Sequence, residues 1–182
     1  MANMQHNCGP HLDNTRLASL GAVLFVFWLG LLTSSAAEAP IRSNSWRLVR
    51  SANPTGGPDA VSVARTADIS RSDLDFVGLM LRCSGESAEV AIIALTPFPP
   101  KAKPSVHIGA NGEEAQFVAQ VVPPGAELLL PLEATALAYG PWQRVHELSV
   151  TVTSPEQSFA GIIQIDGLSE ALTTLTANCA PH

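Results

Sequence analysis

The chain has 182 residues, of which 46% are hydrophobic and only 14% are charged, so it is long and apolar enough for an ordered domain with its own core. Its formal net charge is −6, which argues against a nucleic-acid partner, because binding to phosphates requires clustered Lys and Arg. Fourteen prolines and thirteen glycines, spread among many Val, Ile and Thr residues, favour short strands joined by turns.

The first 37 residues are expected to direct the rest of the chain out of the cytoplasm. Residues 17–32 are an unbroken apolar run that follows Arg16, and small residues lead from it to Ala37. This pattern is typical of a secretory signal cleaved before Glu38, and an uncleaved anchor would give the same topology. We therefore predict a signal peptide or signal anchor over residues 1–37, a flexible linker over 38–44 and a single domain over 45–182. The domain would be periplasmic or secreted, or anchored through residues 17–32 alone.

Four alternating or apolar segments predict the first strands of the domain. They cover residues 46–50, 60–67, 75–83 and 89–95. In the third of them, Val77, Leu79 and Leu81 are expected to share one face of the sheet.

The second half of the domain continues the pattern. Residues 106–110 and 113–122 flank Asn111-Gly112, the strongest short hairpin signal, and further strands are expected at 127–130, 145–153 and 158–165. Residues 132–139 would form helical turns. In residues 168–179 the period becomes helical, with Asp166 or Ser169 as the expected cap. The sequence thus predicts an antiparallel β-sandwich of about eight or nine strands with a short C-terminal helix.

Two cysteines, Cys83 and Cys179, remain after the leader. In an oxidising compartment they have one possible pairing, so a disulfide is predicted, with two separate buried thiols as the alternative. Cys8, with His6 and His11 nearby, lies in the leader and is interpreted as chance spacing.

No catalytic residue, metal ligand or cofactor is predicted. His107 and His146 show no metal-ligand spacing, and the sequence has no nucleophile-elbow or phosphate-loop motif. The alternative is a cell-envelope hydrolase that uses one of these histidines with a nearby acid.

Two segments are candidate binding sites. The first is the proline-rich stretch 97–104, with Phe98, Lys101 and Lys103, and the second is the turn that holds Tyr139 and Trp142. The alternatives are a crossover between the two sheets for the first and a plug over the end of the core for the second.

Three short motifs frame the domain. They are Leu81-Arg82-Cys83, Gly167-Leu168-x-x-Ala171-Leu172 and Leu175-x-x-x-Cys179. In these motifs the chain resembles the periplasmic accessory proteins associated with type VI secretion (VasI/TagO-like), over residues 74–179 and without that family's additional N-terminal cysteine pair. The resemblance implies a β-sandwich with a Cys83–Cys179 bond and a non-catalytic envelope protein that works through protein contacts.

Together these features predict an exported, non-catalytic, envelope-associated module that binds an envelope protein, as a secretion-system accessory in the sense of that resemblance. Edge strands and the proline-rich loop are the expected contact surfaces, because an unpaired edge accepts another strand. The sequence leaves the partner and the oligomeric state open.

Overall fold

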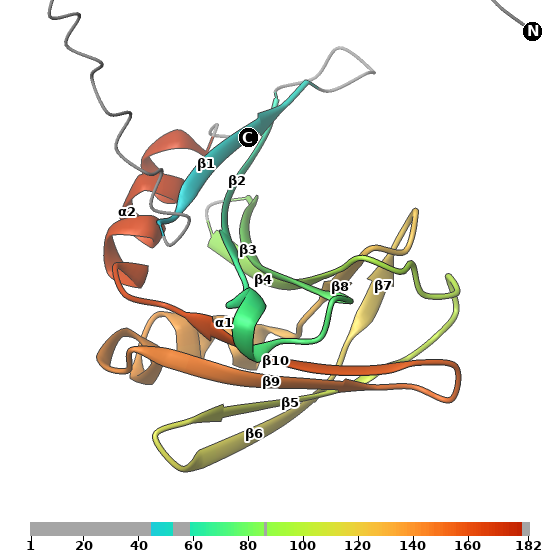
Figure 1. Cartoon of the computed structure of the whole chain (residues 1–182). Helices are drawn as coiled ribbons and strands as arrows, with labels where there is room; N and C mark the ends of the chain where they lie inside the picture. The colour runs from blue at the N-terminus through green and yellow to red at the C-terminus, as the bar shows by residue number, and fades with distance from the viewer. Residues whose placement is uncertain (1–44, 53–58, 86, 180–182) are drawn as a thin grey trace, which may run out of the picture. The chain divides into compact units, whose positions relative to one another are not determined.

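Two antiparallel sheets make up most of the computed structural model, which describes residues 45–52, 59–85 and 87–179 (Figure 1). The predicted leader (1–37) and linker (38–44) lie outside the described residues. The larger sheet has six strands, in the order β1 (Arg47–Ser51), β2 (Ala60–Thr66), β3 (Phe76–Ser84), β4 (Ser87–Ala94), β8 (Glu127–Leu129) and β7 (Gln120–Val122). The smaller has four, in the order β10 (Ser158–Gln164), β9 (Glu147–Thr153), β5 (Ser105–Ala110) and β6 (Glu113–Val118). The predicted antiparallel β-sandwich is confirmed.

The core lies between the two sheets because alternate residues of each strand point inward. In β9 the inward residues are Leu148, Val150 and Val152, each buried as the alternation predicts. Beyond the smaller sheet, helix α2 (Leu168–Asn178) packs on β2, β3 and β4 and covers the rest of the larger sheet's inner face (Figure 1). Two shorter helical segments, α1 (Leu132–Ala138) and the 3-10 turn η2 (Pro141–Arg144), contact each other, and α1 also packs on β4.

The chain passes between the sheets three times, from β4 to β5, from β6 to β7 and from β8 to β9. The proline-rich segment 97–104 carries it from β4 to β5, as the crossover alternative expected. Residues 113–122 are not one strand: β6 ends at Val118 in the smaller sheet, and β7 begins at Gln120 in the larger one. The buried Ala119 lies between them and donates its N–H to the carbonyl of Pro104 (2.9 Å), one step beyond the last β5–β6 pair, Ser105 and Val118.

A bulge in β3 changes the expected face of Val77. The register shifts between Phe76 and Gly78, so Leu79 and Leu81 are buried whereas Val77 is exposed on the outer face. Gly78 has a φ of 155°, and a Cβ at this position would overlap the carbonyl oxygen of Arg65. This close approach of β2 is the physical reason why a glycine stands next to the bulge.

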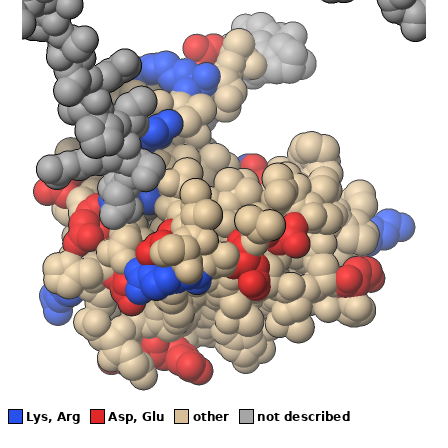
Figure 2. Space-filling model, in the orientation of Figure 1, with Lys and Arg blue, Asp and Glu red and all other residues tan. Residues whose placement is uncertain are grey.

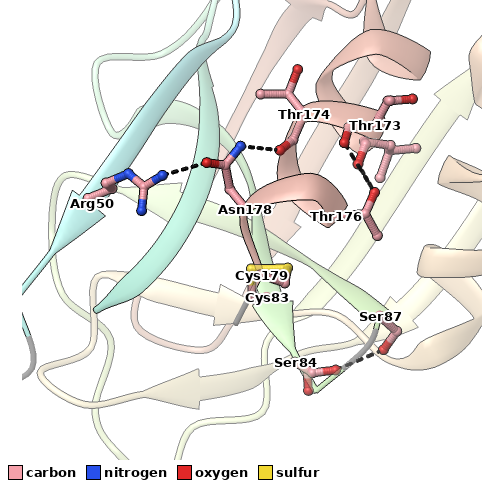
Figure 3. Close-up of a disulfide and its surroundings, with 10 residues drawn as sticks. Arg50, Cys83, Ser84, Ser87, Thr173, Thr174, Thr176, Asn178 and Cys179 are labelled. Atoms are coloured by element: carbon pink, nitrogen blue, oxygen red, sulfur yellow. Dashed lines mark hydrogen bonds between the residues drawn. A yellow bond between two sulfur atoms is a disulfide. The ribbon is translucent and has the colours of Figure 1, made fainter. Parts of the chain in front are cut away.

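The C-terminal strand and helix meet at a glycine corner. Gly167, with a φ of 78°, is the N-cap of α2 and no side chain caps the helix, so the expectation for Asp166 or Ser169 was wrong. The inward face of α2 holds Leu168, Leu172 and Leu175, as predicted. At its end Cys179 forms the predicted disulfide with Cys83 of β3 (Figure 3). Among the described residues, no helix has both the length and the apolar character needed to cross a membrane.

Candidate functional site

The edge strands differ in whether their outer backbone groups are already hydrogen-bonded. Those of β10 are bonded by another segment of the same chain. Residues 68–73 run beside it: the N–H groups of Asp68 and Asp73 donate to the carbonyls of Ile162 and Ala160 (2.8 Å each). In return the Asp73 carboxylate accepts the N–H of Ala160 (2.7 Å). The polar connection predicted here is therefore a strap that occupies the edge of β10, and no further strand can pair there without displacing it.

Two other edges are poor templates for a new strand. The strand β7 has only three residues and runs directly into Pro123 and Pro124. The strand β6 carries two exposed carboxylates, Glu113 and Glu114, at its start. Short edges, prolines and like charges are the devices by which proteins keep edges from pairing.

The strand β1 is longer than β7 and contains no proline, and its only charged residues are two arginines, which repel another basic strand but not an acidic one. All five of its residues are exposed, and among the described residues it pairs with β2 alone. The register places Arg47 and Val49 on the outer face of the sheet, and Leu48 and Arg50 on the face that carries α2. Leu48 and Val49 are each 42% exposed, so this edge offers apolar side chains on both faces.

Both ends of β1 are tied to the domain. Before it, the Trp46 indole Nε1–H donates to the carbonyl of Asp166 (3.0 Å), and Nη1 of the buried Arg65 donates to the same oxygen (2.8 Å). The guanidinium of Arg65 also lies 5.8 Å from the centroid of the Trp46 ring, a cation–π contact. Near its other end, Arg50 donates to the side-chain oxygen of Asn178, next to the disulfide (Figure 3). The edge is therefore held in place and is not a frayed end.

An ion pair lies at the same corner. His146 Nδ1 is 2.6 Å from Asp166 Oδ1, and this hydrogen bond raises the pKa of His146 above its ordinary value. The same bond lowers the pKa of Asp166, with the charges of His146 and Arg65 adding to the effect. The His146 side chain is 88% exposed, so this is a surface contact.

A groove opens beside β1 on the outer face of the larger sheet. It has a volume of about 180 Å³, and Val49, Ala64, Val77 and Ile93 line its apolar part. Val77 belongs to it because the bulge turns this residue outward. Lys and Arg atoms gather over β1 in Figure 2, and Arg47 also lines the groove. Edge, groove and positive charge thus coincide at β1.

The five predicted binding residues do not form one site. Phe98 is 2% exposed and packs edge-on against Phe159, and Trp142 is also buried. Both are core residues, so the side chain of Phe98 is not available to a partner, and Trp142 matches the plug alternative. Lys101, Lys103 and Tyr139 are exposed. Trp142 also lines a cavity of about 300 Å³ at the end of the sandwich, with Leu137 and Arg144.

The parts of a hydrolytic site are divided between the two histidines. His107 lies 3.4 Å from the Ser105 hydroxyl, but its two cross-strand neighbours, Gln116 and Thr151, are not acids. His146 has an acid partner but is solvent-exposed, and among the described residues no hydroxyl bonds to it. No arrangement of a hydroxyl, a histidine and an acid is assembled in the part of the chain that the structure describes. The same residues hold no group of three or more potential metal ligands.

The sequence predicted that edge strands would be contact surfaces, but it did not identify β1 as the open edge. It therefore did not identify Arg47, Val49 and Arg50 of β1 as candidate site residues. One signal in the sequence was available: Leu48 and Val49 stand between two arginines in the first strand of the domain, and a first strand often lies at the edge of its sheet. Comparisons of the chain with protein-family models, curated proteins and solved structures find no match.

Proposed function

We propose that the protein is an exported, non-catalytic module of the cell envelope, and that it binds another envelope protein by accepting an extended segment at the edge of β1. The observation that supports this proposal is the edge of β1. Its five residues are exposed, it pairs on one side only among the described residues, and it is anchored at both ends. An anchored, unpaired strand is a template for strand addition, in which main-chain hydrogen bonds supply affinity and side-chain pockets supply specificity.

Two further observations support an envelope role. The Cys83–Cys179 disulfide is compatible with an oxidising periplasmic or extracellular location. The framing motifs resemble those of type VI secretion accessory proteins, which supports action through protein contacts in that compartment.

Site-specific photocrosslinking in the cells that produce the protein tests this proposal. A photoreactive residue replaces Val49 on β1 in one variant and Val118 on β6 in a matched control, since Val118 is also an exposed valine on an edge strand. A third variant carries it at Thr151, on the outer face of the smaller sheet. We expect a discrete adduct with another envelope protein from position 49 only. Adducts of equal yield from all three positions, or none from position 49, would overturn the proposal.

The mode of binding has its own measurement. Strand addition hydrogen-bonds the outward backbone groups of β1, so amide hydrogen exchange in β1 should slow in the purified complex. Unchanged exchange in β1 would contradict strand addition. A fourth crosslinking position, Lys101, tests the proline-rich loop as a second contact surface.

A further inference from the structure

Resting on the proposed function, we infer the chemistry of the segment that pairs with β1. It is an extended acidic peptide that places a carboxylate opposite Arg47 and another opposite Arg50, with an apolar side chain opposite Val49. Read along the partner in one direction or the other, this is the pattern acidic, any residue, apolar, acidic.

Charge carries the first part of the inference. The chain has a net charge of −6, yet β1 holds two arginines and no carboxylate. Arg71 and Arg82 each pair with two carboxylates, whereas neither Arg47 nor Arg50 forms an ion pair with any described residue. Because Arg47 and Arg50 lie on opposite faces of β1, a partner strand meets one positive charge on each face. Opposite charges directly across a strand pair attract, and like charges there repel.

The groove carries the second part. It extends from Val49 across Ala64 to Val77 and Ile93, on the same face as Arg47. Residues two apart on a strand point to the same side, so one face of a partner strand would bring a carboxylate to Arg47 and an apolar side chain to Val49. A volume of about 180 Å³ accommodates a side chain of the size of leucine. The apolar residue supplies buried area, and the carboxylates select the partner and its register.

A second copy of the chain fits this edge less well. Two β1 strands paired with each other would bring four arginines into one ribbon without a carboxylate in either strand. An acidic partner removes this repulsion, so the structure favours a different chain.

Peptide titrations followed by two-dimensional NMR of the purified protein test the inference. The probes are two ten-residue peptides of Thr and Val. One has Glu-Thr-Leu-Glu at its centre, and the other has the reversed order, Glu-Leu-Thr-Glu. In one control Lys replaces both Glu residues, and in the other Ser replaces Leu. We expect amide shifts in β1 with one of the two acidic peptides, about tenfold weaker binding of the lysine peptide and weaker binding of the serine peptide.

Charge-reversed protein locates the effect. In R47E/R50E the preference should invert toward the lysine peptide. The matched control, K101E/K103E, makes the same change in net charge on the proline-rich loop and should keep the preference for Glu. Equal binding of acidic and basic peptides, or an unchanged preference in R47E/R50E, would overturn the inference.

The two proposals fail in different ways. A crosslink from position 49 together with no selective peptide binding would leave strand addition standing and refute the acidic partner. A position-49 adduct with a second copy of the chain would also refute it. No position-49 adduct at all would refute the proposed function itself.

Discussion

Trp46 and Asp166 are 120 positions apart in the sequence, and a hydrogen bond from the Trp46 indole to the Asp166 carbonyl joins them. Trp46 directly precedes β1, and Asp166 stands at the corner between β10 and α2. Arg65 of β2 donates to the same oxygen, so one carbonyl holds the first two strands against the last strand–helix unit. The open edge of β1 therefore depends on a contact made by the end of the domain.

Replacement of Trp46 by Phe should weaken this anchor modestly. The variant keeps an aromatic ring near Arg65 but removes the N–H donor, and we expect a loss of about 0.5–1.5 kcal/mol in the free energy of unfolding. The loss stays small because Arg65 continues to satisfy the Asp166 carbonyl. Urea unfolding measures the loss, and hydrogen exchange should become faster in β1. Tyr139→Phe, at an exposed position, is the control expected to change neither quantity.

Removal of the disulfide should have a larger effect. The bond joins residues 96 positions apart, and the C83A/C179A variant should lose up to about 4–5 kcal/mol of stability if the gain is mainly chain entropy. Guanidinium unfolding measures the loss. Intact mass tests export in the same material: we expect a chain that starts near Glu38 and whose two cysteines alkylate only after reduction. Full-length chain with freely reactive Cys83 and Cys179 would contradict both expectations.

Local periodicity was enough to predict most of the strands and the C-terminal helix, whereas the disulfide was predicted from the two cysteines that remain after the leader. A buried face can be recognised from residues that are close in sequence. The examples are the alternating Leu148, Val150 and Val152 of β9 and the helically spaced Leu168, Leu172 and Leu175 of α2. The Asn111-Gly112 turn was predictable for the same reason: both residues have positive φ, as a two-residue hairpin turn requires.

The features that define the candidate site depend instead on contacts between distant segments. Val77 turns outward at a bulge where Gly78 lies against the Arg65 carbonyl of the neighbouring strand, and no pattern within β3 reveals this contact. The edge of β10 is closed because Asp73 reaches Ala160, 87 positions away. Which edge stays open follows from strand order, and strand order is a property of the whole chain.

The pair of His146 and Asp166 predicts a pH window. Because the pKa of His146 is raised in the folded state, the contribution of this histidine to the free energy of unfolding is complete below about pH 6.5. This contribution is lost as the pH rises through the folded-state pKa. The lowered pKa of Asp166 means that its contribution is present above about pH 3.9 and is lost as the pH falls. The pair should therefore stabilise the fold mainly between these limits.

Histidine NMR titration checks the pair directly. In D166N the pKa of His146 should fall back toward its ordinary value, because its hydrogen-bonded and charged partner is gone. His107, which lies on β5 and has no acid partner among the described residues, serves as the reference for assigning the two histidine rings. An unchanged His146 pKa in D166N would contradict the contact.

The outer face of the larger sheet holds a charged cluster in which one arginine serves two acids. Arg82 lies 2.8 Å from Glu89 and 2.7 Å from Glu127, and all three side chains are partly buried. Burial raises the pKa of Glu127, although the charge of Arg82 opposes the shift. The ionised Glu127 is thus less favourable in the folded state than in water, and its contribution to stability declines as the pH rises through its folded-state pKa.

Replacement of Arg82 should therefore lower the free energy of unfolding by more than replacement of Glu127. R82M leaves two carboxylates facing each other in a partly desolvated site and should cost about 1–3 kcal/mol at pH 7, reduced from the buried-pair value by the remaining solvent exposure. E127Q, which leaves the Arg82–Glu89 pair intact, should change stability by less than about 0.5 kcal/mol. The R82M deficit should shrink when the pH is lowered from 7 to about 4, because Glu127, whose pKa is raised by burial, takes up its proton over this range, and it should largely disappear in R82M/E89Q/E127Q. Urea unfolding at both pH values measures these differences, and an E127Q loss as large as that of R82M would show that the second ion pair stabilises the fold.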